Sequence, residues 1–422
     1  MATPQVKLAE SLEALRTLQG QGRVAIRSRD LSRTHRERLV KTGFLKEVMK
    51  GWYMVADPRG EAGDSTPWYA SFWDFSAAYL NERFGTDWCL APEQSLSLHA
   101  GNRTVPTMLH VRAPRGGNKL TQLPYETSLM DARYPLPDDA QIVELDGFRL
   151  YSVPAALITC TAAFFRQAPT DVRAAMATIK DASDVLALLL AGGHSTIAGR
   201  LAGAFRNAGQ TRIADDIVKT MNSAGYTIRE TDPFEDVPGA AVIQRNASPY
   251  ANRIRLMWQR LRPAVIDAFP NAPGLPSDKA AYLKAVEEAY VSDAYHSLSI
   301  EGYRVSAALI EKVRQGNWNP DDDQGDLEQR NVLAARGYFD AFQSVKDSLN
   351  RVLSGENAGD VVDEEHGDWY RQLFGPSVAA GIVEAVDLAG YRNGPVYIRR
   401  SMHVPPPRDA VRDCMPALFE LL

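Results

Sequence analysis

The sequence predicts a multidomain α+β protein, with mixed elements in its first half and mainly helices in its second half. The chain has 422 residues, whereas one domain usually has roughly 100–200. Apolar residues make up 45% of the chain and charged residues 23%, which excludes the disordered, collagen-like and coiled-coil classes. Strand-like runs rich in Val, Ile and aromatic residues occur before residue 153, and helical spacing of Ala and Leu dominates after it.

The chain carries no signal for membrane insertion or export. Its longest purely apolar run, residues 185–193, is shorter than the ~20 residues of a membrane-spanning helix. The first 15 residues have the charged pattern of an amphipathic helix rather than that of a secretory signal. Cys89, Cys160 and Cys414 form no CxxC pair and are therefore interpreted as reduced thiols. We expect a cytoplasmic protein that does not contact a membrane.

Positive charge gathers near the start of the chain. Nine Lys and Arg residues lie between Arg23 and Lys50 against three acidic residues, although the whole chain has a net charge of -5. Leu31, His35 and Leu39 share one face of a predicted helix in this segment. The expected elements are a helix at 7–18, a short connecting stretch at 24–28, this helix, which Gly43 ends, and a hairpin of strands 45–49 and 52–55 around Lys50-Gly51.

This layout predicts a winged helix over residues 1–58, with operator DNA as its partner. In such modules a helix enters the major groove while flanking cations contact phosphates. The predicted phosphate contacts are Arg29, Arg33, Arg36, Lys41 and Lys50. The alternative is a solvated basic face on a small protein-interaction domain.

Residues 59–232 are predicted to form a mixed α+β domain. The expected strands are 108–112, 141–145 and 148–153, the last two joined by the turn signal Asp146-Gly147, and the expected helices are 174–189 and 197–224. The stretch GGHSTIAGRLAGAFR, residues 192–206, superficially resembles a phosphate-binding loop, but its spacing favours a packing helix.

The basic segment followed by WCLAPEQSLSLHAG, residues 88–101, resembles transcriptional regulators of the AbiEi antitoxin type. The resemblance covers about residues 5–230. It implies that the chain binds operator DNA or holds a toxin in check.

Residues 233–248 are rich in Pro and lack a sustained period, so they are predicted to be a linker. The helices expected beyond it are 250–268, 279–298, 306–315 and 327–353. Two acidic stretches, residues 321–326 and 363–366, are interpreted as solvated loops. The first departs from a calcium loop in the position of its Gly and lacks the Glu needed at the twelfth place.

Ser297 and Glu301 lie four residues apart at a predicted helix end, and Gly302 suits the helix stop. With GNWNPDDDQGD and AGYRNGPVYIRRSMHVPPPRDAVRDCMPALFELL further on, this motif resembles the part of Fic-domain proteins that precedes their catalytic core, over residues 249–422. The family transfers AMP from ATP to a hydroxyl of a target protein, usually with Mg²⁺. The resemblance therefore implies ATP and Mg²⁺ as cofactors, and a target protein with a Ser, Thr or Tyr hydroxyl as partner.

The resemblance also assigns roles to two groups of residues. Glu301 would be an inhibitory carboxylate that pairs with an Arg of the core, and Ser297 would orient its helix. Residues 391–401 would be a flap, a hairpin with Asn393-Gly394 as its turn, that holds an extended segment of the target by main-chain pairing. The docking residues of this flap are Val396, Tyr397, Ile398 and Ser401. Pro405 to Pro407 would end its strand, and a helix beginning near Asp409 is expected to turn Val411, Met415, Leu418 and Leu422 inward.

The catalytic signature of the family, HPFxxGNGRxxR, does not occur in residues 1–422, where none of the seven His residues is followed by Pro-Phe. The signature supplies a general base, a metal ligand and an anion hole. We therefore assign no catalytic or metal-ligating residue, and expect this chain alone to bind neither ATP nor Mg²⁺. Two interpretations stay open: the regulatory and target-docking part of an autoinhibited transferase, or a non-enzymatic transcriptional regulator or antitoxin whose Fic-like helices bind a partner. Self-association is compatible with both.

Overall fold

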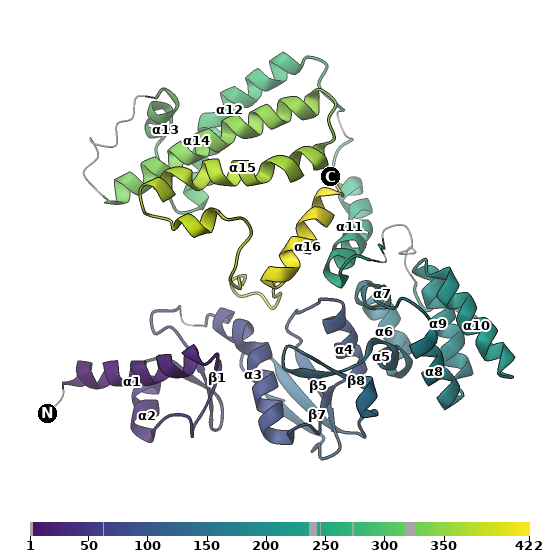
Figure 1. Cartoon of the computed structure of the whole chain (residues 1–422). Coiled ribbons are helices and arrows are strands. Elements are labelled where there is room, and N and C mark those ends of the chain that lie inside the picture. Colours follow the sequence, from purple (N-terminus) through teal and green to yellow (C-terminus); the bar gives the residue numbers. More distant parts are fainter. Residues whose placement is uncertain (1–2, 62, 236–242, 245, 272–273, 317–325) are drawn as a thin grey trace. The chain divides into compact units, whose positions relative to one another are not determined.

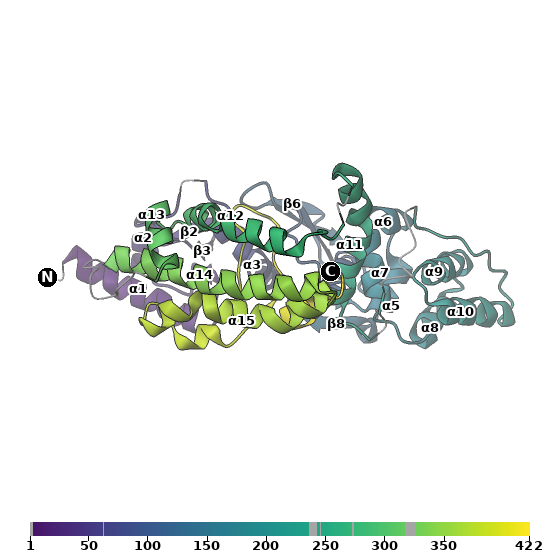
Figure 2. The same cartoon turned by 90° about the horizontal axis from the view of Figure 1, so that it is seen from above.

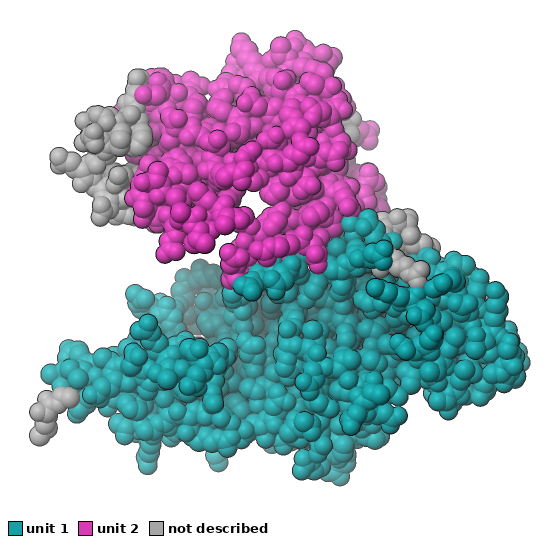
Figure 3. Space-filling model, in the orientation of Figure 1, with its two compact units in different colours: residues 1–257, 395–410 teal, residues 258–394, 411–422 magenta. Residues whose placement is uncertain are grey.

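The computed structural model describes residues 3–61, 63–235, 243–244, 246–271, 274–316 and 326–422. The protein is α+β, which confirms the predicted fold class at this level. The chain divides into two compact units, a first unit of residues 1–257 with 395–410 and a second unit of residues 258–394 with 411–422 (Figure 3). None of the described helices is long and apolar enough to cross a membrane.

The first unit begins with two helices (Figure 1) and an antiparallel sheet of strand order β1-β3-β2. The Ser32 hydroxyl caps α2 by accepting the His35 amide hydrogen at 3.2 Å. Gly51 forms the hairpin turn with a φ of 83°, a conformation that glycine adopts without steric cost. The predicted helix and hairpin are thus confirmed. The elements are α1 (Pro4–Gly20), β1 (Ala25–Arg27), α2 (Arg33–Lys41), β2 (Leu45–Met49) and β3 (Trp52–Val55).

Both faces of this sheet are covered, because successive strand residues point to opposite sides. Ile26 and Val55 pack with Leu39 of α2 in one hydrophobic cluster. Ala25 and Met54 belong to a second cluster, which also contains the buried residues of α3 (Thr66–Phe84). If a strand shifted by one residue against its neighbour, its side chains would move to the opposite faces of the sheet. Because both faces are buried, such a shift is unfavourable, and the register is fixed.

Helix α3 is an element that the sequence analysis did not locate. Trp68, Phe72 and Phe75 are at most 1% exposed, and the Trp68 indole N–H donates to Thr127 Oγ1 at 2.9 Å. The buried residues of α3 are spread around most of its circumference. The helix therefore lacks the single apolar stripe by which an amphipathic helix is predicted from a sequence.

The sheet beside α3 has the strand order β4-β5-β7-β6, with β5 and β7 parallel. A separate hairpin, β8-β9, turns at Asp146-Gly147, where both residues have positive φ values of 50° and 79°, as a type I′ turn requires. The three predicted strands are confirmed. The elements are β4 (Cys89–Leu90), α4 (Pro92–His99), β5 (Met108–Ala113), β6 (Lys119–Gln122), β7 (Ser128–Arg133), η1 (Asp139–Gln141), β8 (Ile142–Leu145) and β9 (Phe148–Tyr151).

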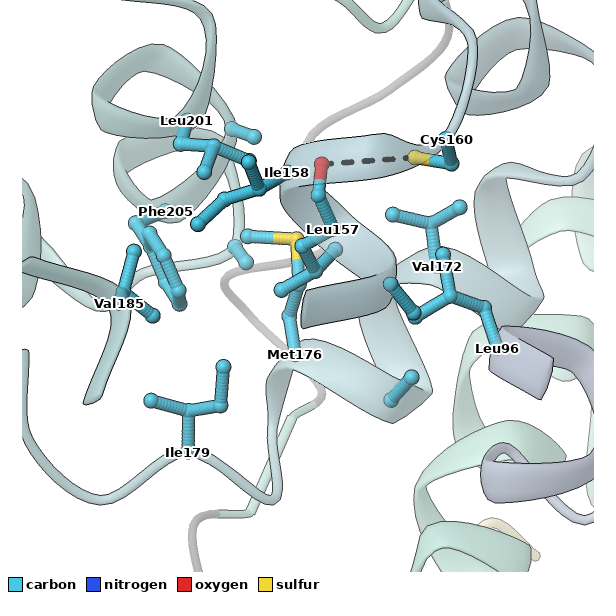
Figure 4. Close-up of a cluster of buried hydrophobic side chains, with 14 of the residues drawn as sticks. Leu96, Leu157, Ile158, Cys160, Val172, Met176, Ile179, Val185, Leu201 and Phe205 are labelled. Atoms are coloured by element: carbon cyan, nitrogen blue, oxygen red, sulfur yellow. Dashed lines mark hydrogen bonds between the residues drawn. The ribbon is translucent and has the colours of Figure 1, made fainter. Parts of the chain in front are cut away.

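Short helices build a third hydrophobic core of the first unit, around Leu157, Met176 and Phe205 (Figure 4). The continuous helices predicted at 174–189 and 197–224 are each broken. The Asp181 carboxylate accepts the Ser183 amide hydrogen at 2.8 Å in the first break, and Gly209 has a φ of 78° in the second. The elements are α5 (Val153–Thr159), α6 (Ala162–Gln167), α7 (Pro169–Met176), α8 (Ser183–Gly192), α9 (Ser195–Asn207) and α10 (Thr211–Ser223).

The glycines that suggested a phosphate loop serve packing. Helix α9 lies side by side with α10 (Figure 2), and a Cβ at Gly199 or Gly203 would collide with the carbonyl oxygen of Arg229 or Thr231. The Thr231 amide donates to the Gly199 carbonyl at 3.2 Å. The two glycines therefore let the segment after α10 run against the helix backbone.

The second unit is helical among its described residues, and α14 and α15 run side by side in both views (Figure 1, Figure 2). Tyr290 is fully buried, with the rings of Phe339 and Phe342 at 5.5 and 4.9 Å. The four predicted helices are confirmed within two residues. The elements, including α11 and α16, which each extend across both units, are α11 (Pro249–Ala268), α12 (Lys279–Ile300), α13 (Ala307–Arg314), α14 (Asp326–Leu353), α15 (Ala358–Ala379), η4 (Ala385–Leu388) and α16 (Arg408–Phe419).

Two predictions about the helices of this half are wrong. Residues 363–366 are not a loop but lie inside α15, which begins at the N-cap Asn357 in spite of the glycines nearby. The predicted inward face of α16 is rotated: Leu418 and Leu422 are 42% and 66% exposed, whereas Ala410, Cys414 and Ala417 are buried. The acidic stretch 321–326, apart from its last residue, and linker residues 236–242 and 245 lie outside the described residues.

We expect Gly203→Ala to destabilise the protein by about 1–3 kcal/mol, because the added Cβ forces the backbone at Thr231 to move. Gly375→Ala is the matched control, since a Cβ there meets nothing within 4 Å in α15. It should stabilise its helix by about 0.5–1 kcal/mol. Urea unfolding followed by circular dichroism measures both changes, and equal effects would contradict the packing role of Gly203.

Candidate functional site

The motif of Ser297, Glu301 and Gly302 forms the end of α12, as predicted. Glu301 is the C-cap residue, and its amide donates to the Ser297 carbonyl at 3.2 Å. Gly302 stops the helix with a φ of 84°, and the Tyr303 amide returns to the Leu298 carbonyl at 3.0 Å. These bonds satisfy carbonyls of the last turn and fix the direction in which the chain leaves it.

Ser297 is held by a neighbour on another helix. The Tyr338 hydroxyl of α14 donates to Asp293 Oδ2 at 2.6 Å and lies 3.2 Å from Ser297 Oγ. Burial, and next the hydrogen bond to Asp293, raise the pKa of Tyr338, so the phenol stays a donor at neutral pH. Tyr338 is a positioning residue that the motif alone gave no means of finding, because the contact spans 41 positions of sequence.

Glu301 points to solvent. It is exposed, and no hydrogen bond or ion pair of its carboxylate occurs among the described residues. Ile300, the preceding residue, is 83% exposed, which is unusual for a large aliphatic side chain. The end of α12 therefore presents a carboxylate beside an uncovered apolar side chain.

The flap predicted at 391–401 is not a hairpin. Val396, Tyr397 and Ile398 are 46%, 40% and 51% exposed and form no ladder with any described residue. A two-residue turn at Asn393-Gly394 would need Pro395 to donate a hydrogen bond across the turn, and proline has no amide hydrogen.

Local hydrogen bonds fix the backbone that follows these exposed residues. The Ser401 amide donates to the Ile398 carbonyl at 3.1 Å in a turn, and the Ser401 hydroxyl accepts the His403 amide hydrogen at 3.1 Å. The residues expected to dock a target thus lie together, but not in a strand.

The five cations predicted to contact phosphate differ in their surroundings. Arg29 pairs with Glu82 of α3 at 2.5 Å, Arg33 with Glu37 at 2.7 Å. The Arg36 side chain donates to the Ser28 carbonyl at 2.6 Å. Lys41 and Lys50 are exposed, with no polar partner among the described residues. Sequence reasoning missed Glu82, which lies on a helix that it did not locate.

Asp30 joins two further arginines of the same segment. Its side chain is 6% exposed and pairs with Arg27 at 3.0 Å and Arg23 at 3.2 Å, and it accepts the Arg27 amide hydrogen at 2.8 Å. Burial acts to raise the pKa of Asp30, but the bonds from Arg27 and the charges of Arg27 and Arg23 outweigh it, so the pKa lies below its usual value. Asp30 therefore stays ionised and ties the chain between β1 and α2.

The described residues offer few groups for chemistry. They contain no group of three or more His, Cys, Asp or Glu side chains that could hold a metal ion. Burial raises the pKa of Cys89 and of Cys160 to about 12, so both remain thiols at neutral pH and are poor nucleophiles.

We expect Asp30→Asn to make the free energy of unfolding less dependent on pH in the acid range. Because the pKa of Asp30 is lowered by folding, its contribution is full above its unfolded pKa of about 3.9 and is lost as pH falls through the folded value. The free energies of unfolding of the wild type and the variant should thus differ most above about pH 5 and become equal in stronger acid. Urea midpoints from pH 2 to 7 test this, with the exposed Glu47→Gln as control; parallel curves would contradict it.

Comparison with known proteins assigns no family. No family model matches the chain, and no curated protein matches its sequence. Among solved structures, one match is the crystal structure of the RV2827C protein from Mycobacterium tuberculosis, with 14% sequence identity and a TM-score of 0.34, over 53% of this chain and 82% of that chain. A likeness of this size carries no argument about function.

Proposed function

We propose that this chain is the regulatory and target-docking part of a Fic-type protein adenylyltransferase, and that Glu301 is its inhibitory carboxylate. The observation that carries the proposal is the end of α12, where Glu301 is exposed and free of partners among the described residues. A carboxylate in this state is available to an arginine, with which it forms a strong, often bidentate, hydrogen bond. The exposed Ile300 beside it would gain apolar cover from the same partner.

The position of Glu301 is well defined, as an inhibitory group requires. Tyr338 lies beside Ser297 one turn away, and the bonds after Gly302 hold the chain. The backbone at Glu301 is therefore fixed before pairing, and only its exposed side chain would be ordered by an arginine.

ATP and Mg²⁺ are part of the proposal only through a catalytic core. Residues 1–422 lack the HPFxxGNGR signature, and the described residues hold no candidate metal cluster. No step of AMP transfer is therefore assigned to these residues.

The test begins with the reading frame after codon 422, which should encode an HPFxxGNGR signature. In a protein that contains residues 1–422 and this signature, we expect Glu301→Gln to increase labelling of the target by labelled ATP. Loss of a charge-assisted hydrogen bond of about 1.5–3 kcal/mol corresponds to roughly ten-fold or more.

Glu288→Gln is the matched control, because Glu288 lies on the same helix with its side chain 68% exposed. It should label the target at the parental rate. Equal labelling by Glu301→Gln and its parent would refute Glu301 as the inhibitor. A frame that ends without the signature would refute the transferase itself.

As a second function, we infer that residues 1–58 form a winged helix that binds DNA. The order of a helix, strand, helix and hairpin, with Lys50 at the hairpin turn and Lys41 at the end of α2, supports this inference. The sheet faces are covered by helices, which leaves the hairpin turn and the outer side of α2 for a partner. The clustered positive charge favours nucleic acid over protein.

We expect each of Lys41→Ala and Lys50→Ala, which remove exposed cations, to lower the salt dependence of DNA binding. Each lost phosphate contact should reduce the slope of log K against log salt by about 0.9. Fluorescence anisotropy with the full chain and a labelled duplex from upstream of its own gene measures the slope. Lys219→Ala, an exposed cation on α10, should leave it unchanged. Binding that is insensitive to salt would support the protein-interaction alternative.

A further inference from the structure

Residues 399–404, which follow the exposed residues Val396 to Ile398, belong to the first unit and are bound by residues from its early part. The Val105 amide donates to the Met402 carbonyl at 2.8 Å, and the Arg400 amide donates to Thr66 Oγ1 at 2.8 Å. Two main-chain groups of one short segment are thus bound by elements that lie some 300 residues earlier in the chain.

The polar end of this attachment is preorganised. The Thr66 hydroxyl donates its hydrogen to Asp64 Oδ1 at 2.6 Å, which leaves an oxygen lone pair for the Arg400 amide. Glu61 forms ion pairs with Arg399 and with Arg400, the latter at 3.1 Å. The site therefore recognises the backbone and both charges of a paired arginine sequence.

The apolar end of the attachment reaches the core. Met402 and Val404 are half-buried against the cluster that contains the aromatic residues of α3. Val396 and Ile398, earlier in the segment, are exposed. The anchoring side chains thus begin where the exposed docking residues end.

Backbone geometry indicates that these contacts impose a conformation. Arg400 has a φ of 56°, in the left-handed region that non-glycine residues seldom occupy and that persists only when neighbours hold it. The Ser401 amide is used by the turn to Ile398. A strand running from residue 396 to 401 would need both features to change.

We propose that residues 399–404 are a strap that keeps the target-docking segment out of strand conformation, and that a target pairs with this segment only after the strap is released. Pairing by strand addition uses amide and carbonyl groups along an edge, and the strap already occupies those of Arg400 and Met402. The docking role rests on the proposed function, whereas the attachment itself is independent of it.

Hydrogen exchange of the full chain, followed by mass spectrometry, tests the attachment. Peptides that contain Val105 and Arg400 should exchange slowly in the wild type and at least ten-fold faster in Met402→Asp. Ile398→Asp makes the same change of charge at an exposed position and should leave both peptides unchanged. Fast exchange of both peptides in the wild type, or no change in Met402→Asp, would overturn the strap.

Reversing the charges of the exposed ion pairs between Glu61 and Arg399 and Arg400 tests the attachment without a change in the hydrophobic core. Glu61→Arg should speed exchange at Arg400, and adding Arg399→Glu and Arg400→Glu should restore slow exchange. A triple variant that remains as fast as Glu61→Arg alone would argue against the ion pairs.

Labelling assays separate the strap from the proposed function. In a protein that contains the catalytic signature, Glu61→Arg should increase target labelling in the Glu301→Gln background. Faster exchange without more labelling would overturn the gating step and leave the role of Glu301 intact. No labelling by any variant, Glu301→Gln included, would instead refute the transferase and with it the docking role.

Discussion

The first unit depends on the burial of α3. Near its start, Thr66 accepts the Arg400 amide hydrogen; in its middle, Phe75 and Tyr79 meet Trp52 of the basic hairpin, both at 5.7 Å. Near its end, Glu82 holds two arginines of the basic segment. A helix buried around most of its circumference has one stable orientation, so the groups at its two ends keep a fixed separation.

The parts of the fold that follow local rules could be predicted from the sequence. The helix with Leu39 inward and the hairpin at Gly51 were foreseen because their signals lie within a few residues. Helix α3 was not, since its aromatic residues obscure any stripe. The flap hairpin failed for a local reason that could have been noticed, because Pro395 cannot donate across the turn.

In the candidate sites, too, the features set by local sequence could be predicted, whereas the long-range contacts could not. Ser297, Glu301 and Gly302 lie where their spacing placed them, because helix periodicity and a glycine stop are local properties. The partners that define their environment come from elsewhere: Tyr338 lies beside Ser297, and Glu82 binds Arg29. No pattern in a single sequence identifies such a long-range partner, because the contact is created by the fold.

Glu82 also changes how the positive charge of the basic segment is to be counted. It contacts Arg27 at 2.7 Å and Arg29 at 2.5 Å, so it serves both guanidinium groups as a built-in counterion. Mobile salt ions drive binding to a polyanion through their release into solution, whereas a covalently attached carboxylate is never released. Any polyanion that approaches this segment therefore meets fewer exchangeable ions than its Lys and Arg residues suggest.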